Sequence, residues 1–149
     1  MTRNFPVITY TTTLSGVTAG QLRGGFFEGW PNPPTPETHL RILRGSSQIV
    51  LAHDGEQVVG FINALSDGVL MAWLPLLEVL PAYRGKGIGG ELVRRMLASL
   101  APIYAIDLLC DDSLVPYYQR LGFTAVRGMA LRDYATQSGL PDTGAVTPS

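Results

Sequence analysis

The sequence predicts one α/β domain built on a mixed, mostly antiparallel sheet flanked by helices. Three observations point to this class. The length of 149 residues suits a single domain with a sizeable core. Apolar, β-branched runs separated by turn residues recur through the chain. One long helical stripe lies between two of these runs, which is the pattern of a crossover between parallel strands.

The N-terminal third predicts a strand, two helices and a stiff loop. Residues 7–12 are rich in β-branched side chains and predict the first strand. Residues 18–27 predict a helix, weakened by two internal glycines at about 1 kcal/mol each. Four prolines within residues 31–36 predict an extended loop, and the last of them suits the first position of a second helix. That helix has its N-cap at Thr35 and ends near Gly45.

The middle of the chain predicts a hairpin followed by an interrupted strand. Residues 48–53 and 57–65 are apolar runs joined by an Asp54-Gly55 turn. Residues 69–80 form a longer apolar run, which we expect to be a third neighbour in the sheet. Pro75 cannot donate a ladder hydrogen bond, so it predicts a bulge or a strand that splays from its partner.

The second half of the chain continues with a helix and another strand. Apolar side chains recur at helical spacing from Ile88 to Leu100, and Pro102 ends this helix. Residues 104–110 predict a strand. Because a helix separates this strand from the previous one, we expect the two strands to pair in parallel.

The C-terminal part predicts a short helix, a hairpin and a tail. Two aspartates and a serine at residues 111–113 cap a helix, which a glycine terminates. Residues 124–126 and 129–132 predict a final antiparallel pair of strands. The predicted domain spans residues 1–135, and residues 136–149, which are mostly small and polar, predict a flexible or loosely docked tail.

Composition and charge exclude several classes of partner. A net charge of −1 gives no global attraction to nucleic acid or to an anionic membrane. No apolar stretch approaches the roughly 18–20 residues of a membrane span, and the N-terminal residues lack the apolar core of a signal peptide. A single cysteine excludes an internal disulfide framework and fits a reducing compartment. We therefore expect a cytoplasmic protein without nucleic-acid or membrane partners.

The histidines and the cysteine do not indicate a metal or nucleophile site. His39 and His53 have no partners at metal-ligand spacing, so we expect no metal. We expect each histidine either to lie on the surface or to be hydrogen-bonded. Cys110 has no activating base near it in the sequence, which favours buried packing over a role as nucleophile.

The stretch from Arg84 to Gly90, the glycine turn, is the strongest functional signal. It places four glycines in six residues before a helix, and Arg84 and Lys86 add two positive charges. Glycine lets the backbone approach a ligand closely, and the N–H groups and dipole of a helix start attract phosphate. Taken alone, such a run is also compatible with a plain loop. We interpret it as a phosphate cradle.

Two common nucleotide motifs compete for the glycine turn. A P-loop needs Ser or Thr after its lysine, whereas Lys86 is followed by glycine. The dinucleotide fingerprint G-x-G-x-x-G fits Gly85, Gly87 and Gly90, with Asp107 downstream. That fingerprint begins directly at a strand end, however, and here four residues intervene. A dinucleotide-binding domain is therefore the weaker interpretation.

A third motif fits better. Residues 84–89 fit the Q/R-x-x-G-x-G/A signature of the GCN5-related N-acetyltransferase (GNAT) family, and residues 77–81 resemble the strand that precedes it. Residues 109–123 resemble motif B of the family, in the form of the arylalkylamine (serotonin-type) N-acetyltransferases. The resemblance covers residues 69–123. It implies a GNAT-like three-layer fold with splayed central strands, and acetyl-CoA as co-substrate.

The resemblance implies a coenzyme site residue by residue. The backbone at Leu77 and Val79 would pair with the pantetheine arm, and the amides of the glycine turn would hold the pyrophosphate beside Arg84. Lys86 is equally compatible with a solvated loop lysine, and the side chain of Ile88 with a place in the core. The implied coenzyme-binding set is Leu77, Val79, Arg84, Gly85, Lys86, Gly87, Ile88, Gly89 and Gly90.

The resemblance also implies a catalytic acid. Tyr118 matches the family's tyrosine that gives a proton to the departing thiolate. Because Leu114 and Leu121 share its helical face, an ordinary core tyrosine is the alternative. Tyr117 takes the role if the register slips. Asp111 stands where many family members have asparagine, and it predicts a helix cap more than a coenzyme contact.

A general base is also required, because an alkylamine with a pKa of about 10 costs roughly 4 kcal/mol to deprotonate at pH 7. The arylalkylamine enzymes use a pair of histidines, and the matching positions here are Trp73 and Pro75. Glu78 is the best-placed substitute, since strand alternation turns it away from its apolar neighbours. A salt-bridged strand carboxylate is its alternative role, and Glu28 and Asp112 are the other candidate bases.

The sequence therefore predicts an acetyl-CoA-dependent N-acetyltransferase. A primary amine would attack the bound thioester directly, and a small-molecule amine is favoured over a protein. The rigid loop at residues 30–36 is either a wall of the acceptor site or a simple connection. A non-catalytic acyl-CoA-binding sensor or partner module on the same fold is the alternative. Because members of the family often dimerise, a homodimer is compatible with the resemblance.

Overall fold

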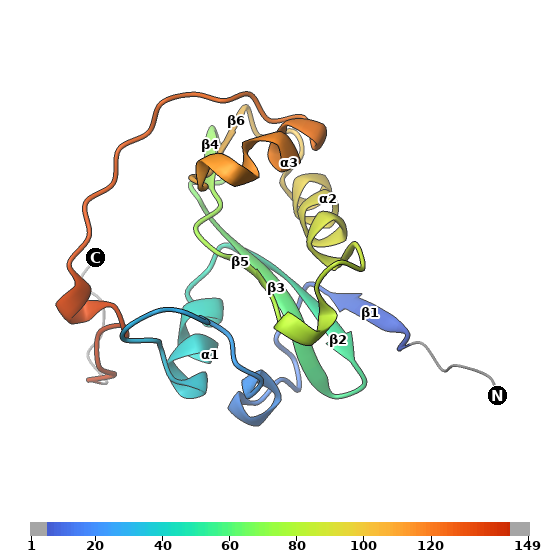
Figure 1. Ribbon diagram of the computed structural model, residues 1–149, viewed down its shortest axis with the longest axis vertical. Coiled ribbons are helices and arrows are strands. Elements are labelled where there is room, and N and C mark those ends of the chain that lie inside the picture. The colour runs from blue at the N-terminus through green and yellow to red at the C-terminus, as the bar shows by residue number, and fades with distance from the viewer. Residues whose placement is uncertain (1–5, 144–149) are drawn as a thin grey trace.

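A computed structural model describes residues 6–143 of the chain. Within these residues, six strands form one sheet in the order β1-β2-β3-β4-β6, and β5 pairs with β3 off this path (Figure 1). The strands are β1 (Ile8–Thr11), β2 (Gln48–Asp54), β3 (Gln57–Ser66), β4 (Met71–Trp73), β5 (Leu77–Val79) and β6 (Ala105–Asp107). The α-helices are α1 (Pro36–Arg44), α2 (Ile88–Leu100) and α3 (Val115–Arg120). Short 3-10 turns are η1 (Ala19–Leu22), η2 (Pro81–Tyr83), η3 (Asp112–Leu114) and η4 (Tyr134–Thr136).

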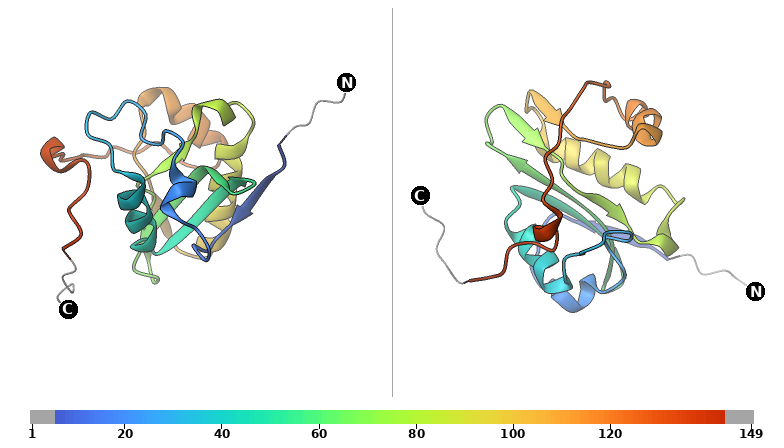
Figure 2. Two further views of the ribbon diagram at one scale, coloured as in Figure 1. Left: turned by 90° about the horizontal axis from the view of Figure 1, so that it is seen from below. Right: turned by 60° about the vertical axis from the view of Figure 1, so that its left-hand side comes forward.

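The elements stack in three layers, as predicted. Helix α2 packs on one face of the sheet, and α1 with η1 packs on the other (Figures 1 and 2). Alternation along β2 and β3 divides the core between the two faces, because successive side chains of a strand point to opposite sides. The α2 side contains Val50, Ala52, Val59, Ile62, Leu92, Val93 and Met96. The α1 side contains Leu22, Leu40, Leu43, Ile49, Leu51, Val58 and Phe61.

The two longer helices follow from local sequence signals. The hydroxyl of Thr35 accepts a hydrogen bond of 3.1 Å from the N–H of Thr38, and Pro36 opens α1 as predicted. Arg41 and Arg44 lie in the last turn, where the helix dipole favours positive charge. Helix α2 buries the predicted apolar stripe against β2 and β3.

The predicted strand at residues 69–80 is divided in two. Strand β4 pairs antiparallel with the last two residues of β3, and β5 pairs antiparallel with its middle, residues 60–62. Pro75 lies in the gap between β4 and β5. At this break, the side-chain carbonyl of Asn63 accepts a hydrogen bond of 3.1 Å from the N–H of Leu76. Strand β6 pairs in parallel with β4 and, among the described strands, does not pair with β5. The predicted splay is therefore a gap between β5 and β6.

Three predicted elements differ in extent from the structure. The helix predicted at residues 18–27 is only η1, because Gly25 and Phe27 have φ angles of 94° and 64°, which no α-helix contains. The hairpin turn lies at Gly55-Glu56, one residue later than predicted, because Asp54 still pairs with Gln57. The strand predicted at residues 104–110 is limited to β6.

The predicted final pair of strands, residues 124–126 and 129–132, is wrong. These residues form no strand. Residues 124–133, here named the strap, instead run extended from the end of α3 to η4 (Figure 1). Neither half of the strap has a partner strand in the described structure, so local propensity alone did not make a hairpin.

The first part of the predicted tail contacts the domain. The amide N–H of Asn32 donates to the side-chain oxygen of Gln137 at 2.9 Å, and Arg41 donates to the carbonyl of Leu140 at 3.0 Å. The rest of the tail, residues 144–149, lies outside the described residues. Between residues 6 and 143, no helix is both long and apolar enough to cross a membrane.

Candidate active site

Two cavities meet where β5 separates from β6. The first, named the cleft, has a volume of about 590 Å³ and is lined by β5, Trp30, the segment after β6, and part of the strap. The second, named the glycine-turn cavity, has a volume of about 450 Å³ and lies between β5, α3 and the start of α2. The two cavities share four lining residues: Leu77, Glu78, Leu114 and Tyr118.

Two residues of the glycine turn have a left-handed backbone conformation. Gly85 and Gly87 have φ angles of 76° and 82°, which disfavour other residue types. Gly87 is also the N-cap of α2 and has no side chain to accept from the N–H groups of the first helical turn. These N–H groups therefore remain available to a ligand in the glycine-turn cavity, at the positive end of the helix dipole.

The two cations of the turn have protein partners. The guanidinium of Arg84 donates to the carbonyl of Val79 at 3.1 Å and pairs with Glu28 at 3.1 Å. Lys86 donates to the carbonyl of Ala82 at 3.4 Å and lies over the ring of Tyr83. Arg84 lines the glycine-turn cavity, whereas Lys86 is exposed and is absent from its lining. The solvated-lysine interpretation thus describes Lys86 better.

Strand β5 presents one unpaired edge to the gap. Leu77 and Val79 pair with β3 on one side, and both residues line the glycine-turn cavity. No described strand covers the other edge. The side chain of Ile88 is buried in the core, which is the alternative role expected for it.

Glu78 lies where the two cavities meet. Its carboxylate accepts a hydrogen bond of 2.7 Å from the backbone N–H of Phe27. Burial raises the pKa of Glu78, and the neighbouring Glu28 raises it further, while the hydrogen bond from Phe27 and the charge of Arg84 oppose the rise. A carboxylate with a raised pKa is a stronger base, which suits it to accept a proton near neutral pH.

Tyr118 also lies at the junction of the cavities. Burial raises its pKa to about 12, with additional contributions from Tyr117 and Cys110. Its ring packs edge-on against the rings of Tyr117 and Phe123, at centroid distances of 5.0 and 5.8 Å. The phenol is therefore protonated at any physiological pH and is able to donate a hydrogen bond.

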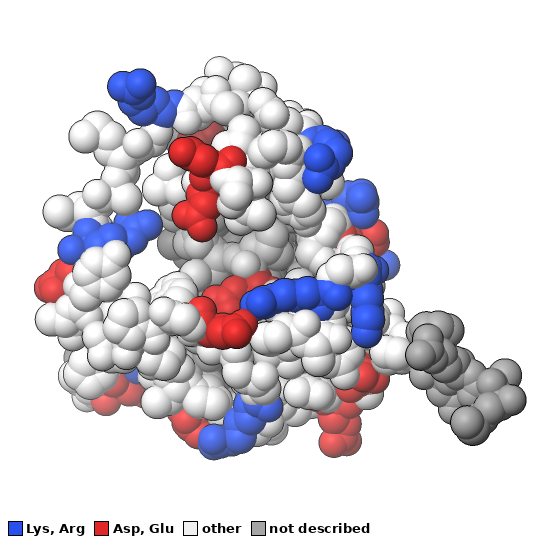
Figure 3. Space-filling model, in the orientation of Figure 1, with Lys and Arg blue, Asp and Glu red and all other residues white. Residues whose placement is uncertain are grey.

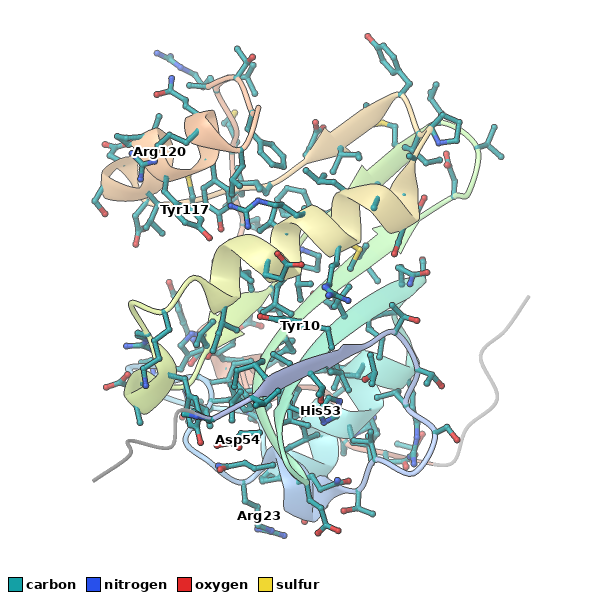
Figure 4. All side chains as sticks on the ribbon, turned by 90° about the vertical axis from the view of Figure 1, so that its right-hand side faces the viewer. Tyr10, Arg23, His53, Asp54, Tyr117 and Arg120 are labelled. Atoms are coloured by element: carbon teal, nitrogen blue, oxygen red, sulfur yellow. The ribbon has the colours of Figure 1, made fainter. Side chains whose placement is uncertain are left out.

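Tyr117, the neighbour of Tyr118 in α3, does not lie at the junction of the two cavities. It lines only the glycine-turn cavity, on the side of α3 that faces α2 (Figure 4). A Cβ built on Gly89 would lie 3.2 Å from the Tyr117 hydroxyl, so the phenol reaches the first turn of α2. The two adjacent tyrosines therefore face different regions: Tyr118 faces both cavities and Tyr117 the helix start.

The cleft has a lining that combines apolar side chains with two carboxylates, Glu78 and Asp111, and one guanidinium, Arg132. Trp30 lines it, in agreement with a wall formed by the start of the proline-rich loop, and so do Pro75, Cys110 and Asp111. Figure 3 shows acidic side chains on both sides of the hollow at the centre of this face. The expected cap by Asp111 is wrong, because its side chain makes no capping hydrogen bond to η3.

The histidines lie away from both cavities. His53 bonds to the hydroxyl of Thr11 at 2.8 Å, as one of the two expected roles requires. The expectation for His39 is wrong, because its side chain is 1% exposed and its Nε2 has no hydrogen-bond partner. The ring is enclosed by Phe26, Phe27 and Phe61, which form an aromatic cluster that no local sequence signal indicates. Among residues 6–143, no three His, Cys, Asp or Glu side chains are grouped as a metal site.

The family of the chain follows from comparison with known proteins. A family model described as "Acetyltransferase (GNAT) domain" matches residues 45–125, which extend from the start of β2 to just beyond α3. This segment contains β5, the glycine turn and both tyrosines of α3. The chain therefore belongs to the GNAT acetyltransferase family.

Two solved structures resemble the whole domain. One, from Deinococcus radiodurans R1 and classed as an acetyltransferase, is 53% identical with a TM-score of 0.89, over 95% of this chain and 99% of that one. The other is a GNAT acetyltransferase from Brucella melitensis in complex with acetyl-CoA. It is 26% identical with a TM-score of 0.60, over 81% of this chain and 85% of that one.

A curated relative carries the name of the subfamily that motif B resembles. Serotonin N-acetyltransferase 2, chloroplastic, from Oryza sativa subsp. japonica is 31% identical over 109 residues, which is 66% of this chain and 54% of the relative. The chain spans about half the length of the first curated relatives it matches.

Proposed function

We propose that the protein is an acetyl-CoA-dependent N-acetyltransferase, in which a primary amine attacks the bound thioester directly. The observation that carries this proposal is the junction of the two cavities, where Glu78 and Tyr118 line both. One cavity begins at a helix N-terminus suited to pyrophosphate, and the other is open to a second substrate. The reacting atoms of both substrates would meet at the residues they share.

The residues of the glycine-turn cavity fit coenzyme A. The positive φ angles of Gly85 and Gly87 leave backbone N–H groups uncovered at the start of α2, where pyrophosphate would bind. The free edge of β5 offers backbone hydrogen bonds to an extended pantetheine arm, as an added strand would receive. Arg84 lines the same cavity and supplies positive charge. Acetyl-CoA bound in this way supplies the acetyl group as a thioester.

Glu78 is the proposed base. The amine must lose a proton to attack, and the raised pKa of Glu78 brings this carboxylate closer to the value that a base needs near pH 7. Glu78, or a water held by it, accepts the proton that the ammonium gives up before attack. The new C–N bond forms as the C–S bond breaks, and the nitrogen loses its second proton to solvent as the amide forms. The hydrogen bond from Phe27 fixes the orientation of this carboxylate, and Glu78 lines both cavities.

Tyr118 is the proposed partner of the departing sulfur. A thiol has a pKa of about 8.5, so complete proton transfer from a phenol with a pKa of about 12 is uphill by roughly 5 kcal/mol. Hydrogen-bond donation that stabilises the developing thiolate is therefore the better-supported role. Solvent then protonates the thiolate after it leaves.

A small amine is the proposed acceptor. A volume of about 590 Å³ lies within the range of small-molecule sites. The two carboxylates of its lining, Glu78 and Asp111, outnumber the single cation Arg132 and so favour a cationic amine. Trp30 and the leucines of the lining favour an apolar body. The histidine positions of the arylalkylamine enzymes are Trp73 and Pro75 here, so we do not extend the serotonin-type resemblance to the substrate.

The test is amine-dependent release of thiol from acetyl-CoA. A panel of alkylamines, arylalkylamines, aminoglycosides and peptide N-termini is assayed with a thiol reagent, alongside calorimetric titration of coenzyme A and NAD. Thiol release above background with one class of amine supports the proposal. Coenzyme A binding without release for any acceptor supports a non-catalytic acyl-CoA-binding module. NAD binding without coenzyme A binding refutes both.

A further inference from the structure

The cleft contains one cation that the proposed reaction does not use. Arg132 is the only Lys or Arg among the described residues that line it. Within residues 6–143 its guanidinium forms no ion pair, neither with Glu78 nor with Asp111 of the same lining. A guanidinium that no protein carboxylate neutralises is able to bind an anionic group of a ligand, with two parallel N–H donors.

The backbone of the strap turns Arg132 toward the cleft. The strap is extended, so successive side chains point to opposite sides. The residues of the strap that line the cleft are Gly128, Met129, Ala130 and Arg132. Leu131 is absent from this lining and is 98% exposed. At the end of the strap, the side chains thus alternate between the cleft and solvent, and Arg132 is on the side of the cleft.

The end of the strap is held against the loop that forms another wall of the cleft. The side chain of Asn32 donates to the carbonyl of Tyr134 at 3.2 Å, close in sequence to both Trp30 and Arg132. The acidic neighbour of Arg132 does not neutralise it, because the carboxylate of Asp133 accepts a hydrogen bond of 3.0 Å from the backbone of η4. Arg132 therefore combines a fixed backbone position with an unpaired charge.

The opposite charges of the cleft come from different walls. Glu78 belongs to β5 and lines both cavities at their junction, whereas Arg132 belongs to the strap and does not line the glycine-turn cavity. Most of the other lining residues are apolar, among them Trp30 and Leu76. In the space-filling view, basic side chains lie along the strap and acidic side chains border the central hollow (Figure 3). A ligand that matches this lining has a positive group, an apolar body and a negative group.

We propose that the acceptor is an amine that also carries a carboxylate or a phosphate several bonds away from its nitrogen, and that Arg132 binds this anionic group. The inference rests on the proposed function, in which the nitrogen lies at Glu78. An anionic group directly beside the nitrogen, as in an α-amino acid, would lie near the carboxylate of Glu78 and be repelled by it. Arg132 is thus a specificity-determining residue of the acceptor site.

The first test compares matched acceptors. The value of kcat/KM for thiol release is measured for ω-amino carboxylates of increasing chain length, each against the alkylamine of equal length, and for phosphoethanolamine against ethanolamine. Once the chain is long enough to reach Arg132, the anionic member of a pair is expected to be favoured by about fivefold to fiftyfold, mainly through a lower KM. The carboxylate and phosphate series show which anion is preferred. Diamines of equal length are expected to be poorer acceptors than the amino carboxylates.

The second test changes the cation. Arg132→Gln is expected to bring the ratio between paired acceptors close to one, and Arg132→Lys to keep part of the preference because it keeps the charge. Arg127→Gln is the matched control, since Arg127 also belongs to the strap but lines a separate groove beside β6 and not the cleft. This control is expected to retain the full preference.

The outcomes separate this inference from the proposed function. Equal kcat/KM values within every pair overturn it, as does a preference that persists in Arg132→Gln, while either result leaves the acetyltransferase activity in place. The same pairs are titrated calorimetrically in the presence of coenzyme A, so the preference is also measured if no acceptor releases thiol. In that case the proposed function fails, and equal or undetectable binding of both members of each pair overturns the role of Arg132 as well.

Discussion

The carboxylate of Glu78 accepts a hydrogen bond of 2.7 Å from the backbone N–H of Phe27, a residue 51 positions earlier in the chain. This contact joins β5 to the loop that carries Trp30, so one side chain connects the candidate base to a wall of the cleft. Phe27 has a φ angle of 64°, a conformation that is costly for a bulky residue. The hydrogen bond helps to hold it there.

Glu78→Gln is expected to lower kcat by about 10²-fold to 10⁴-fold near neutral pH, because glutamine keeps an oxygen for the Phe27 N–H but cannot accept the amine's proton. In the wild type, the rate rises with pH as Glu78 loses its proton, and the midpoint lies above the usual value for glutamate because burial raises its pKa. A pH–rate profile checks both points. Retention of this limb in the variant would exclude Glu78 as the base.

Tyr118→Phe is expected to lower kcat by about tenfold to a hundredfold while the affinity for coenzyme A changes little, since the variant loses only the hydroxyl that would face the sulfur. Tyr117→Phe is the informative comparison, because the Tyr117 hydroxyl reaches the start of α2. Its loss should act on coenzyme affinity more than on kcat. Single-turnover rates and calorimetric Kd values separate the two effects, and the opposite pattern would exchange the roles of the two tyrosines.

Gly87→Ala is expected to weaken coenzyme A binding and to lower the free energy of unfolding by roughly 1–2 kcal/mol, because alanine disfavours a φ angle of 82°. Gly16→Ala is a matched control, since Gly16 has a φ angle of 77° and an added Cβ would meet no atom within 4 Å at either site. Both variants should lose similar stability, and only the first should lose coenzyme affinity. Equal affinities would remove the glycine turn from the binding site.

His39 is expected to make the protein less stable in mild acid. Burial lowers its pKa from 6.5 to about 4, so the unfolded chain binds a proton at a higher pH than the folded one. The stabilising effect of the neutral ring is complete above pH 6.5 and declines as the pH falls toward 4, by about 3 kcal/mol in total. Denaturant unfolding at pH 7 and pH 5 checks this against His39→Leu, which should lose this component of the pH dependence. An unchanged pH dependence would contradict it.

The parts of the fold that sequence predicts are those with local causes. The capped α1, the apolar stripe of α2 and the glycine turn depend on residues within a few positions of one another. The sequence also predicts the break at Pro75, because a proline cannot donate a hydrogen bond to the neighbouring strand. The junction of β5 with α3 followed only from the resemblance to a family.

The predictions that the structure contradicts concern contacts between segments far apart in the chain. The strap has the residues of a hairpin, but in the described structure its two halves pair neither with each other nor with the edge strand β6. His39 is enclosed by rings from η1's following loop and from β3, and nothing near residue 39 indicates this. The contact between Glu78 and Phe27 also joins residues far apart in the chain, so no local sequence signal predicts it.

The buried side chain of Asn63 connects β3 to the chain on both sides of it, close to the gap between β5 and β6. Its side chain is 2% exposed, and it donates to Ser46 at 3.0 Å while its carbonyl holds the N–H of Leu76. The opening in the sheet is thus built into the continuous strand β3 and does not depend on a ligand to part the strands. Coenzyme binding would require no rearrangement of the sheet, so none of its contact energy would be spent on parting the strands.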